Sequence, residues 1–312
     1  MLPESHYTRT GATVAGKPLT GLVDARRVLH LFDEGATVVL QGLHRYWPPL
    51  RELVADLELE LGHPCQANAY LTPPGAQGFA VHSDSHDVFV FQTHGRKQWE
   101  IHADGRVDDV LLEPGLAMYL PTGTPHAARA QDSVSLHVTL GINQLTWRGV
   151  VEQTVRDLLG DLPDGHLPAG YLDDPAQLAS GLRVRLDEVA DRVRDLDTEA
   201  AARERVEWFL TTRSARLRGG LRDLVEVRDL TDDTRLARRA GSPCVLVDHD
   251  GGLRVLLGDR TLDVPARVRP ALEQVRSAAE LAPADLAEHL DPESRLVLCR
   301  RLVREGLLEV VG

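Results

Sequence analysis

The chain of 312 residues is 43% hydrophobic and 26% charged, and its formal net charge at pH 7 is -12. This length exceeds what one compact core usually serves, so two or three modules are expected. The negative charge opposes nonspecific binding to nucleic acid and to anionic membranes, and no apolar run approaches the roughly 20 residues of a membrane-spanning helix. We therefore expect neither a nucleic acid nor a membrane as a direct partner.

The cysteines and the amino-terminal residues indicate a reducing compartment. Cys65, Cys244 and Cys299 are odd in number and far apart, which predicts neither a disulfide framework nor a paired-cysteine zinc site. The first twenty residues lack the basic head and apolar stretch of a secretory signal. The expected location is the cytoplasm.

The first 143 residues change character at residue 65. Apolar spacing predicts a helix around 28–32, a strand at Val38-Val39 and a helix over 50–61. Short alternating or apolar runs then follow, separated by turns rich in proline and glycine, at 67–71, 87–91, 97–101, 116–120 and 134–142. This pattern is typical of a β-sandwich or barrel, and we expect a jelly-roll core here.

Helical spacing returns beyond Thr146, with apolar stripes over 150–159, 178–196 and 200–217. The last ninety or so residues mix strands with helices. We expect strands at 244–247 and 253–257 joined by the turn 248–252, helices beginning near Pro265, Pro283 and Pro292, and a closing strand at 307–311. The order of hairpin, helices and strand predicts a winged-helix-like unit.

Three residues form a candidate metal site. His82 and Asp84 are two apart, so in an extended segment both side chains point to the same face. His126 lies 42 residues after the aspartate, at the end of a predicted strand and turn. Two histidines and one carboxylate occupy one face of an octahedral iron and leave three positions open for a bidentate 2-oxo acid and dioxygen. The alternative for the His-x-Asp pair alone is a solvated turn with a stray histidine.

Several ordered motifs surround these residues between positions 66 and 143. They are Asn68–Pro73, Gln77–Phe79, His82–Gln92, Gly95–Trp99, Leu112–Gly115, Pro121–His126 and Ser135–Thr139. Together they resemble the JmjC-type ribosomal oxygenases, a branch of the cupin superfamily. The resemblance implies an α+β chain with a double-stranded β-helix (jelly-roll, cupin) JmjC catalytic domain over 1–146, an all-helical dimerisation region over 147–222 and a winged-helix-like domain over 223–312.

The same resemblance implies roles for individual residues. His82, Asp84 and His126 would hold Fe(II), and Lys97 would anchor the distal carboxylate of 2-oxoglutarate. An ammonium in a partly desolvated pocket suits that role, and the chain has only one other lysine, Lys17. Tyr70 and Asn68 would line the cosubstrate pocket. The alternatives are a surface lysine at position 97 and ordinary strand packing for Tyr70 and Asn68.

Four further residues near these motifs have weaker predictions. His86 is four residues from His82, but a turn is expected between them, so we interpret it as a surface or supporting residue. His137 either lines the pocket or is a core histidine. Gln92 and Trp99 are expected to pack near the substrate without a catalytic role.

The predicted activity is oxidative decarboxylation of 2-oxoglutarate with dioxygen, coupled to hydroxylation of a side chain in a protein, expected to be a ribosomal protein. An acidic enzyme suits such basic substrates, and the resemblance implies a homodimer. From Val225 to Gly312 the chain has thirteen arginines, no lysine and sixteen acidic residues, so the winged-helix-like part should bind phosphate poorly.

Three other functions are compatible with the sequence. The same core could hydroxylate a peptide or a small amino-acid-derived metabolite. A cupin dioxygenase or isomerase independent of 2-oxoglutarate would usually have more histidine ligands and no need for Lys97. A noncatalytic cupin binding module would be expected to lack one of the three ligands.

Overall fold

The computed structural model describes residues 2–9, 11, 13–15, 17–18 and 20–311. The chain divides into two compact units, Met1–Leu145 and Thr146–Gly312. The boundary lies one residue from the predicted end of the first domain. The further division of the second unit at residue 222 stays a prediction.

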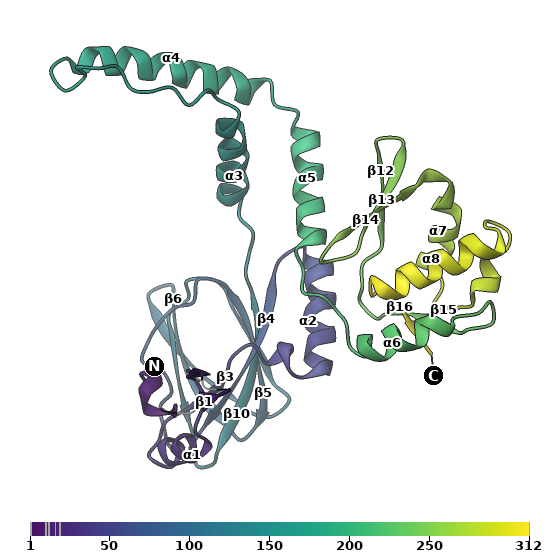
Figure 1. Ribbon diagram of the computed structural model, residues 1–312. Coiled ribbons are helices and arrows are strands. Elements are labelled where there is room, and N and C mark those ends of the chain that lie inside the picture. Colours follow the sequence, from purple (N-terminus) through teal and green to yellow (C-terminus); the bar gives the residue numbers. More distant parts are fainter. Residues whose placement is uncertain (1, 10, 12, 16, 19, 312) are drawn as a thin grey trace. The chain divides into compact units, whose positions relative to one another are not determined.

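The first unit begins with short elements and helices α1 and α2, and strands make up the rest of it (Figure 1). Its elements are η1 Glu4–His6, β1 Thr13–Val14, β2 Lys17–Pro18, α1 Ala25–Asp33, β3 Val38–Leu40, η2 Leu43–Arg45, α2 Pro48–Leu61, β4 Cys65–Thr72, β5 Asp87–His94, β6 Lys97–Ala103, β7 Arg106–Leu112, β8 Ala117–Leu120, β9 His126–Ala130 and β10 Ser135–Ile142. The helices and strands expected before residue 65 are present. The sequence patterns missed β7 and β9, because their charged and small residues do not produce an apolar run.

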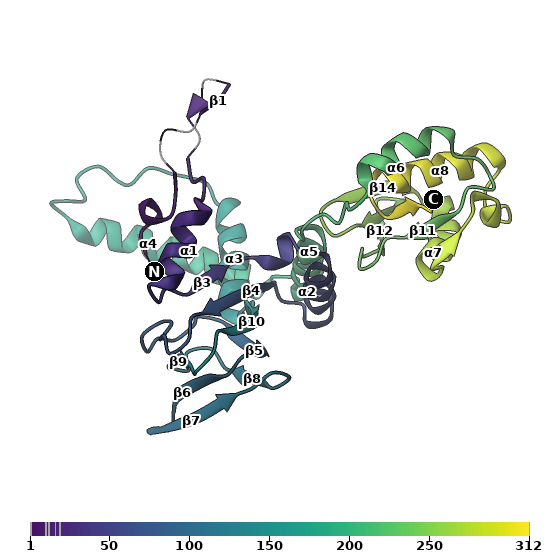
Figure 2. The ribbon, with the colours of Figure 1, turned by 90° about the horizontal axis from the view of Figure 1, so that it is seen from below.

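Two antiparallel sheets form the core of this unit, with the strand orders β3-β4-β10-β5-β8 and β7-β6-β9 (Figure 2). Val88 and Val90 of the larger sheet share one hydrophobic cluster with Trp99 and Ile101 of the smaller sheet, so the sheets pack face to face. Isolated bridges at Gln77↔Arg129 and His82↔His126 extend the smaller sheet beyond β9. The predicted β core and the mixed α and β composition are therefore confirmed.

Local signals explain where the two helices of this unit begin and end. The side chain of Asp24 accepts hydrogen bonds from the backbone N–H groups of Arg26 and Arg27, which caps α1. Helix α2 has proline in its first turn and ends at Gly62, whose φ of 66° suits the left-handed region. Leu50 and Val54 of α2 pack on the outer side of the larger sheet.

The second unit contains three longer helices followed by short strands and helices. Its elements are α3 Trp147–Gly160, α4 Pro175–Arg194, α5 Thr198–Thr211, α6 Gly220–Glu226, η3 Val227–Asp229, β11 Leu236–Arg238, β12 Val245–His249, β13 Gly252–Leu256, β14 Thr261–Pro265, η4 Ala266–Val268, α7 Arg269–Ser277, β15 Glu280–Leu281, η5 Pro283–Leu286, α8 Pro292–Arg304 and β16 Leu308–Val310. None of the described helices is long and apolar enough to cross a membrane.

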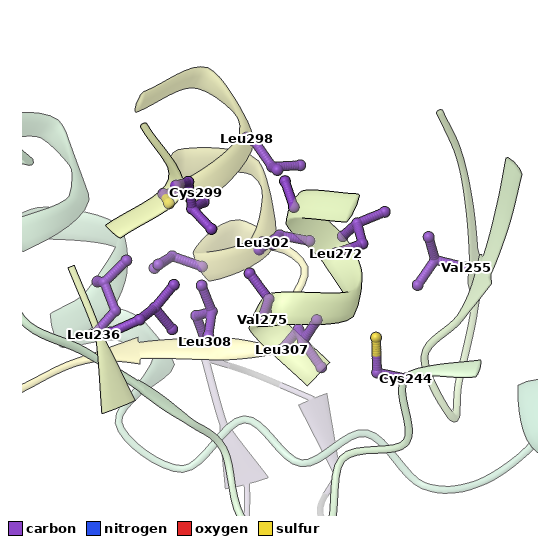
Figure 3. Close-up of a cluster of buried hydrophobic side chains, with 14 of the residues drawn as sticks. Leu236, Cys244, Val255, Leu272, Val275, Leu298, Cys299, Leu302, Leu307 and Leu308 are labelled. Atoms are coloured by element: carbon purple, nitrogen blue, oxygen red, sulfur yellow. The ribbon is translucent and has the colours of Figure 1, made fainter. Parts of the chain in front are cut away.

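The core of the second unit lies in its last ninety residues. Leu302 of α8, Leu272 of α7 and Leu308 of β16 are fully buried and point into one cluster (Figure 3). The three strands β15-β11-β16 and the three strands β12-β13-β14 form separate small sheets. A winged-helix-like domain and a dimerisation region stay predictions for this unit.

Two predicted helical segments differ from the observed elements. The segment beginning at Pro283 is a four-residue 3-10 turn, in which the Asp285 side chain accepts a hydrogen bond from the backbone N–H of Ala282. The stripe over 200–217 is helical only to Thr211. The expected hairpin at 248–252 is present, with positive φ at Asp250 and Gly251.

Candidate metal centre

The three predicted ligands lie together in the first unit. One ligand atom of His82, one of Asp84 and one of His126 lie within 4.8 Å of one another. The Nε2 atom of His126 is 3.8 Å from the Oδ2 atom of Asp84. His126 is buried as the first residue of β9, whereas His82 and Asp84 are partly buried. The geometry is that of a site able to hold one metal ion.

Backbone hydrogen bonds hold the two ligand-bearing stretches against each other. The N–H of His126 donates to the carbonyl of His82 at 2.7 Å, and the N–H of His82 donates back to the carbonyl of His126 at 3.0 Å. The N–H of Gly123 donates to the carbonyl of Asp84 at 2.9 Å. The ligands are therefore positioned by the sheet itself.

Both histidine rings are oriented by a carbonyl two residues earlier in the chain. The Nδ1 atom of His82 is 2.9 Å from the carbonyl oxygen of Ala80, and the Nδ1 atom of His126 is 2.9 Å from that of Thr124. Because a carbonyl can only accept a hydrogen bond, Nδ1 carries the proton and donates it. In a neutral ring the lone pair of Nε2 is then free. This is the tautomer that binds a metal through Nε2.

The protonation state of His126 also favours a metal. Burial lowers its pKa most strongly, the hydrogen bond to Thr124 opposes this in part, and the neighbouring His82 lowers the pKa and Asp84 raises it by less. A neutral imidazole is the form that coordinates metals. Two imidazoles and one carboxylate fit the donor set of a non-haem Fe(II) centre.

A cavity of about 250 Å³ lies beside this group of ligands. The three ligands line it, together with Thr37, Tyr70, Gly78, Phe79, Val88, Val90, Lys97, Trp99, Leu120, Ala128, His137 and Thr139. The lining residues that β5 contributes are apolar, and the residues around Lys97 include polar ones. A second cavity, of about 680 Å³, is bordered by α1 and β3 and shares Thr37, Gly78 and Phe79 with the first.

Lys97 is a buried ammonium inside this cavity, with only 3% of its surface exposed. Its Nζ donates to the hydroxyl of Thr72 at 3.0 Å and lies 3.4 Å from the Nδ1 atom of His137. Within the part of the chain that the structure describes, no carboxylate forms an ion pair with it. Burial lowers the pKa of Lys97 to about 8.

Tyr70 and Asn68, both on β4, occupy different positions relative to the cavity. Tyr70 lines it and stacks on His137, with ring centroids 4.8 Å apart and an interplanar angle of 2°. Asn68 does not line it; its Oδ1 accepts a hydrogen bond from the N–H of Gly42 at 2.8 Å. The geometry therefore supports a direct cosubstrate contact for Tyr70 better than for Asn68.

The four residues with weaker predictions separate into two pairs. His137 and Trp99 line the cavity, and burial holds the pKa of His137 well below its usual value, so this ring is neutral. His86 lies against Gly141 and outside the ligand group. Gln92 is buried, and its Nε2 donates to the carbonyl of His94 and the hydroxyl of Ser135, which is a structural role.

Sequence reasoning missed Thr37, which lines the cavity, and Thr72, which contacts both Thr37 and Lys97. Thr72 is two residues beyond Tyr70 on β4 and faces the same side, where it orients Lys97. Its hydroxyl is 3.1 Å from that of Thr37. Strand alternation from Tyr70 would have identified Thr72, but Thr37 precedes β3 and only the pairing of β3 with β4 brings it here.

Comparison with known proteins agrees with this geometry. Residues 50–107 and 102–150 match the family model of the JmjC domain. The matched residues lie almost entirely within the first unit. The predicted resemblance to JmjC-domain ribosomal oxygenases is confirmed by this match and by the curated relatives.

Curated relatives match the JmjC domain region. A Drosophila mojavensis protein named bifunctional lysine-specific demethylase and histidyl-hydroxylase NO66 is 33% identical over 135 residues, covering 36% of this chain and 15% of its own. Ribosomal oxygenase 1 of Rattus norvegicus is 33% identical over 145 residues, covering 39% of this chain and 24% of its own. The chain thus spans a quarter or less of the length of these relatives.

Solved structures of the Escherichia coli ribosomal oxygenase YcfD share the fold. One is 18% identical with a TM-score of 0.50, covering 88% of this chain and 78% of that chain. Another, in complex with cobalt and succinic acid, is 19% identical with the same TM-score and the same coverage. At this identity the likeness concerns the fold alone.

Proposed function

We propose that the protein is an Fe(II)- and 2-oxoglutarate-dependent oxygenase that hydroxylates an amino-acid side chain of a protein substrate. One observation carries the proposal: the His82, Asp84 and His126 group and the buried ammonium of Lys97 line the same cavity. A metal centre with open positions lies beside a cation that has no acidic partner among the described residues, and a ligand that binds both would complete the site. A 2-oxo acid with a second carboxylate is such a ligand.

The metal ligands would hold Fe(II) through one nitrogen of each histidine and the carboxylate of Asp84. Bound iron would supply the activation of dioxygen that couples decarboxylation of 2-oxoglutarate to hydroxylation of a C–H bond. The protein contributes the orientation of the rings by the carbonyls of Ala80 and Thr124. It also contributes exclusion of water from the wall formed by Val88, Val90 and Leu120.

Lys97 would bind the distal carboxylate of 2-oxoglutarate. A buried ammonium without a counter-charge costs folding free energy, and a carboxylate ligand offsets this cost through charge-assisted hydrogen bonds. Thr72 holds Nζ in place, and the neutral ring of His137 lies beside it without adding a competing charge. Tyr70, stacked on His137, would present its hydroxyl to the same ligand.

A ribosomal protein is the substrate we propose. The relatives are named ribosomal oxygenase and histidyl-hydroxylase, and the net charge of -12 attracts basic proteins over long distances. The intact group of three ligands argues against a noncatalytic module. A peptide or metabolite substrate is an alternative outcome of the experiment below.

We also propose a homodimer formed through the helices that follow the JmjC domain. Helix α4 has no buried residue, and one face of it displays Leu178, Leu182, Leu186, Val189 and Val193. Leu182, Leu186 and Val193 are 55%, 58% and 44% exposed. An apolar stripe of this length on a helix usually has a partner.

The decisive experiment measures succinate formed from 2-oxoglutarate with Fe(II) and ascorbate, with and without ribosomal proteins extracted from cells. We expect turnover that His82→Ala abolishes and that Lys97→Ala recovers only at high cosubstrate concentration. We also expect ribosomal proteins to stimulate it and to gain one oxygen atom by mass spectrometry. The matched controls are His86→Ala and Lys17→Ala, which should behave like the unaltered protein.

The opposite results separate the alternatives. Metal binding without succinate would contradict the use of 2-oxoglutarate. Succinate formation that ribosomal proteins neither stimulate nor accept oxygen from would contradict the proposed substrate and favour a peptide or a metabolite.

A further inference from the structure

Asp87, at the start of β5, receives three hydrogen bonds from one short stretch of chain. The hydroxyl of Tyr119 donates to its Oδ2 at 2.5 Å. The backbone N–H and the hydroxyl of Thr122 donate to its Oδ1 at 2.7 Å and 2.9 Å. Burial would raise the pKa of this carboxyl, but these hydrogen bonds outweigh it and lower the pKa to about 2. We call Asp87, Tyr119 and Thr122 the Asp87 network.

This network lies on the other side of the sheet from the cavity. Val88 and Val90 of β5 point into the core between the sheets, so Asp87 and Phe89 point outward. Tyr119 is the register partner of Phe89 and packs against its ring at 4.9 Å. Asp87 is therefore not part of the cavity wall, and it cannot touch a ligand bound there.

The network nevertheless joins the two segments that carry the metal ligands. One segment, residues 82–87, carries His82 and Asp84. The other segment, residues 121–126, ends at His126. Three backbone hydrogen bonds, between His82 and His126 in both directions and from Gly123 to Asp84, connect these segments on one side. Asp87 lies three residues after Asp84, and Thr122 lies four residues before His126. The side chain of Asp87 connects the two segments a second time by accepting a hydrogen bond from the backbone N–H of Thr122. The segments are thus fixed at both ends.

Fixing both segments before metal arrives affects the binding free energy. Gly123, in the segment 121–126, has a φ of 80°. The turn before His126 belongs to neither sheet, because β9 begins only at His126. If the turn were free, binding would have to order it, and the lost conformational entropy would weaken metal affinity. Supporting residues of this kind typically change metal affinity by about 10–100-fold.

We propose that Asp87 is a positioning residue of the metal centre, which holds the turn at Thr122 so that His126 meets His82 and Asp84 in a ready-made site. The proposal rests on the metal site of the proposed function. In this proposal Asp87 contacts neither the metal nor the cosubstrate. The network acts through backbone geometry alone.

The test is titration of the metal-free full-length protein with Co(II), followed by visible absorption, with Zn(II) competition to obtain dissociation constants. We expect Asp87→Asn to weaken Co(II) binding by about tenfold or more, and to change the absorption spectrum as His126 moves. Thermal unfolding of each metal-free variant checks that it is folded.

Two further variants separate positioning from charge. Asp87→Asn also removes a negative charge from the neighbourhood of a cation, whereas Tyr119→Phe removes one hydrogen bond to Asp87 and leaves the charge unchanged. We expect Tyr119→Phe to weaken Co(II) binding in the same direction by a smaller factor. Asp109→Asn, on the exposed strand β7, removes a carboxylate outside the network and should leave the dissociation constant unchanged.

The proposal is overturned if Asp87→Asn binds Co(II) like the unaltered protein with the same spectrum. It is also overturned if Asp109→Asn weakens binding as much as Asp87→Asn does, because charge alone would then explain the effect. Amide hydrogen exchange at Thr122 and Gly123 in metal-free protein supplies a readout independent of metal, and Asp87→Asn should accelerate it. If the unaltered protein binds no Co(II) while this exchange effect is present, the proposed function fails and the positioning of the turn stands.

Discussion

At the scale of single residues, Lys97 is a buried cation of the cavity wall. Its ammonium is 3% exposed and is oriented by Thr72. The neighbouring His137 is neutral because burial lowers its pKa, and burial raises the pKa of Tyr70. Lys97, whose pKa is lowered to about 8, is therefore the group of this wall that changes charge just above neutral pH.

This predicts a pH dependence of cosubstrate affinity. Below pH 8 the Lys97 ammonium is charged and would bind the carboxylate of the proposed cosubstrate; above pH 8 the free protein carries a neutral amine, which would have to regain a proton on binding. The dissociation constant of 2-oxoglutarate should rise by up to about tenfold per pH unit above pH 8. Calorimetry with Mn(II) in place of iron, from pH 7 to 9.5, measures it.

Lys97→Arg is the control for this prediction, because a guanidinium stays charged throughout that range. Its affinity should be lower than that of the unaltered protein at pH 7, since the larger group must fit the same cavity, but independent of pH. An affinity that falls equally in both proteins would assign the effect to another group.

At the scale of elements, the turn between β5 and β6 determines the position of Lys97, the first residue of β6. Gly95 has a φ of 63°, and a Cβ added there would lie 2.0 Å from the carbonyl oxygen of Val134. That atom belongs to the backbone just before β10, so it cannot move aside without shifting the central strand of the larger sheet. Glycine is required at this position both for its φ and for the close approach.

We predict that Gly95→Ala lowers the free energy of unfolding by clearly more than Gly105→Ala. Gly105 has a similar φ of 71° but nothing within 4 Å of an added Cβ, so its substitution measures backbone strain alone, about 1 kcal/mol. Urea denaturation followed by circular dichroism gives both values. Equal losses would show that the contact with Val134 relaxes without cost.

At the scale of the whole molecule, the exposed stripe of α4 concerns the oligomeric state. Leu182 and Leu186 are adjacent on one helical face and more than half exposed. Substituting Glu for Leu182 would place a charge in any contact that buries this face. Such a contact would lose stability because an unpaired charge is costly to bury.

We predict that light scattering gives about twice the chain mass of 34.3 kDa for the unaltered protein and about one chain mass for Leu182→Glu. Ser180→Glu is the matched control, since residue 180 lies on the opposite face of the same helix and is exposed. It should remain a dimer. A monomer in all three proteins would contradict the proposed homodimer.

Part of the fold and of the candidate site could be predicted from the amino-acid sequence. The spacing of His82 and Asp84 and the later His126 indicated the candidate metal group, because residues two apart in an extended segment face the same side. The ordered motifs around Lys97 indicated the resemblance to JmjC-type oxygenases. Strands with apolar runs were also predictable. Those with charged or small residues, such as β7 and β9, were not, because their stability comes from pairing with β6.

Other features were decided by the tertiary structure alone. The contact of Thr37 with Thr72, the stacking of Tyr70 on His137 and the bonding of Asn68 to Gly42 join residues that are far apart in the chain. The same holds for Asp87, whose neighbours in sequence suggest only a strand end and whose partners come from a turn 35 residues later. The sequence by itself indicated three candidate metal ligands, because their residue types and spacing can be read without a structure. Sheet pairing decided what surrounds them, because it brings together backbone segments that are far apart in the chain.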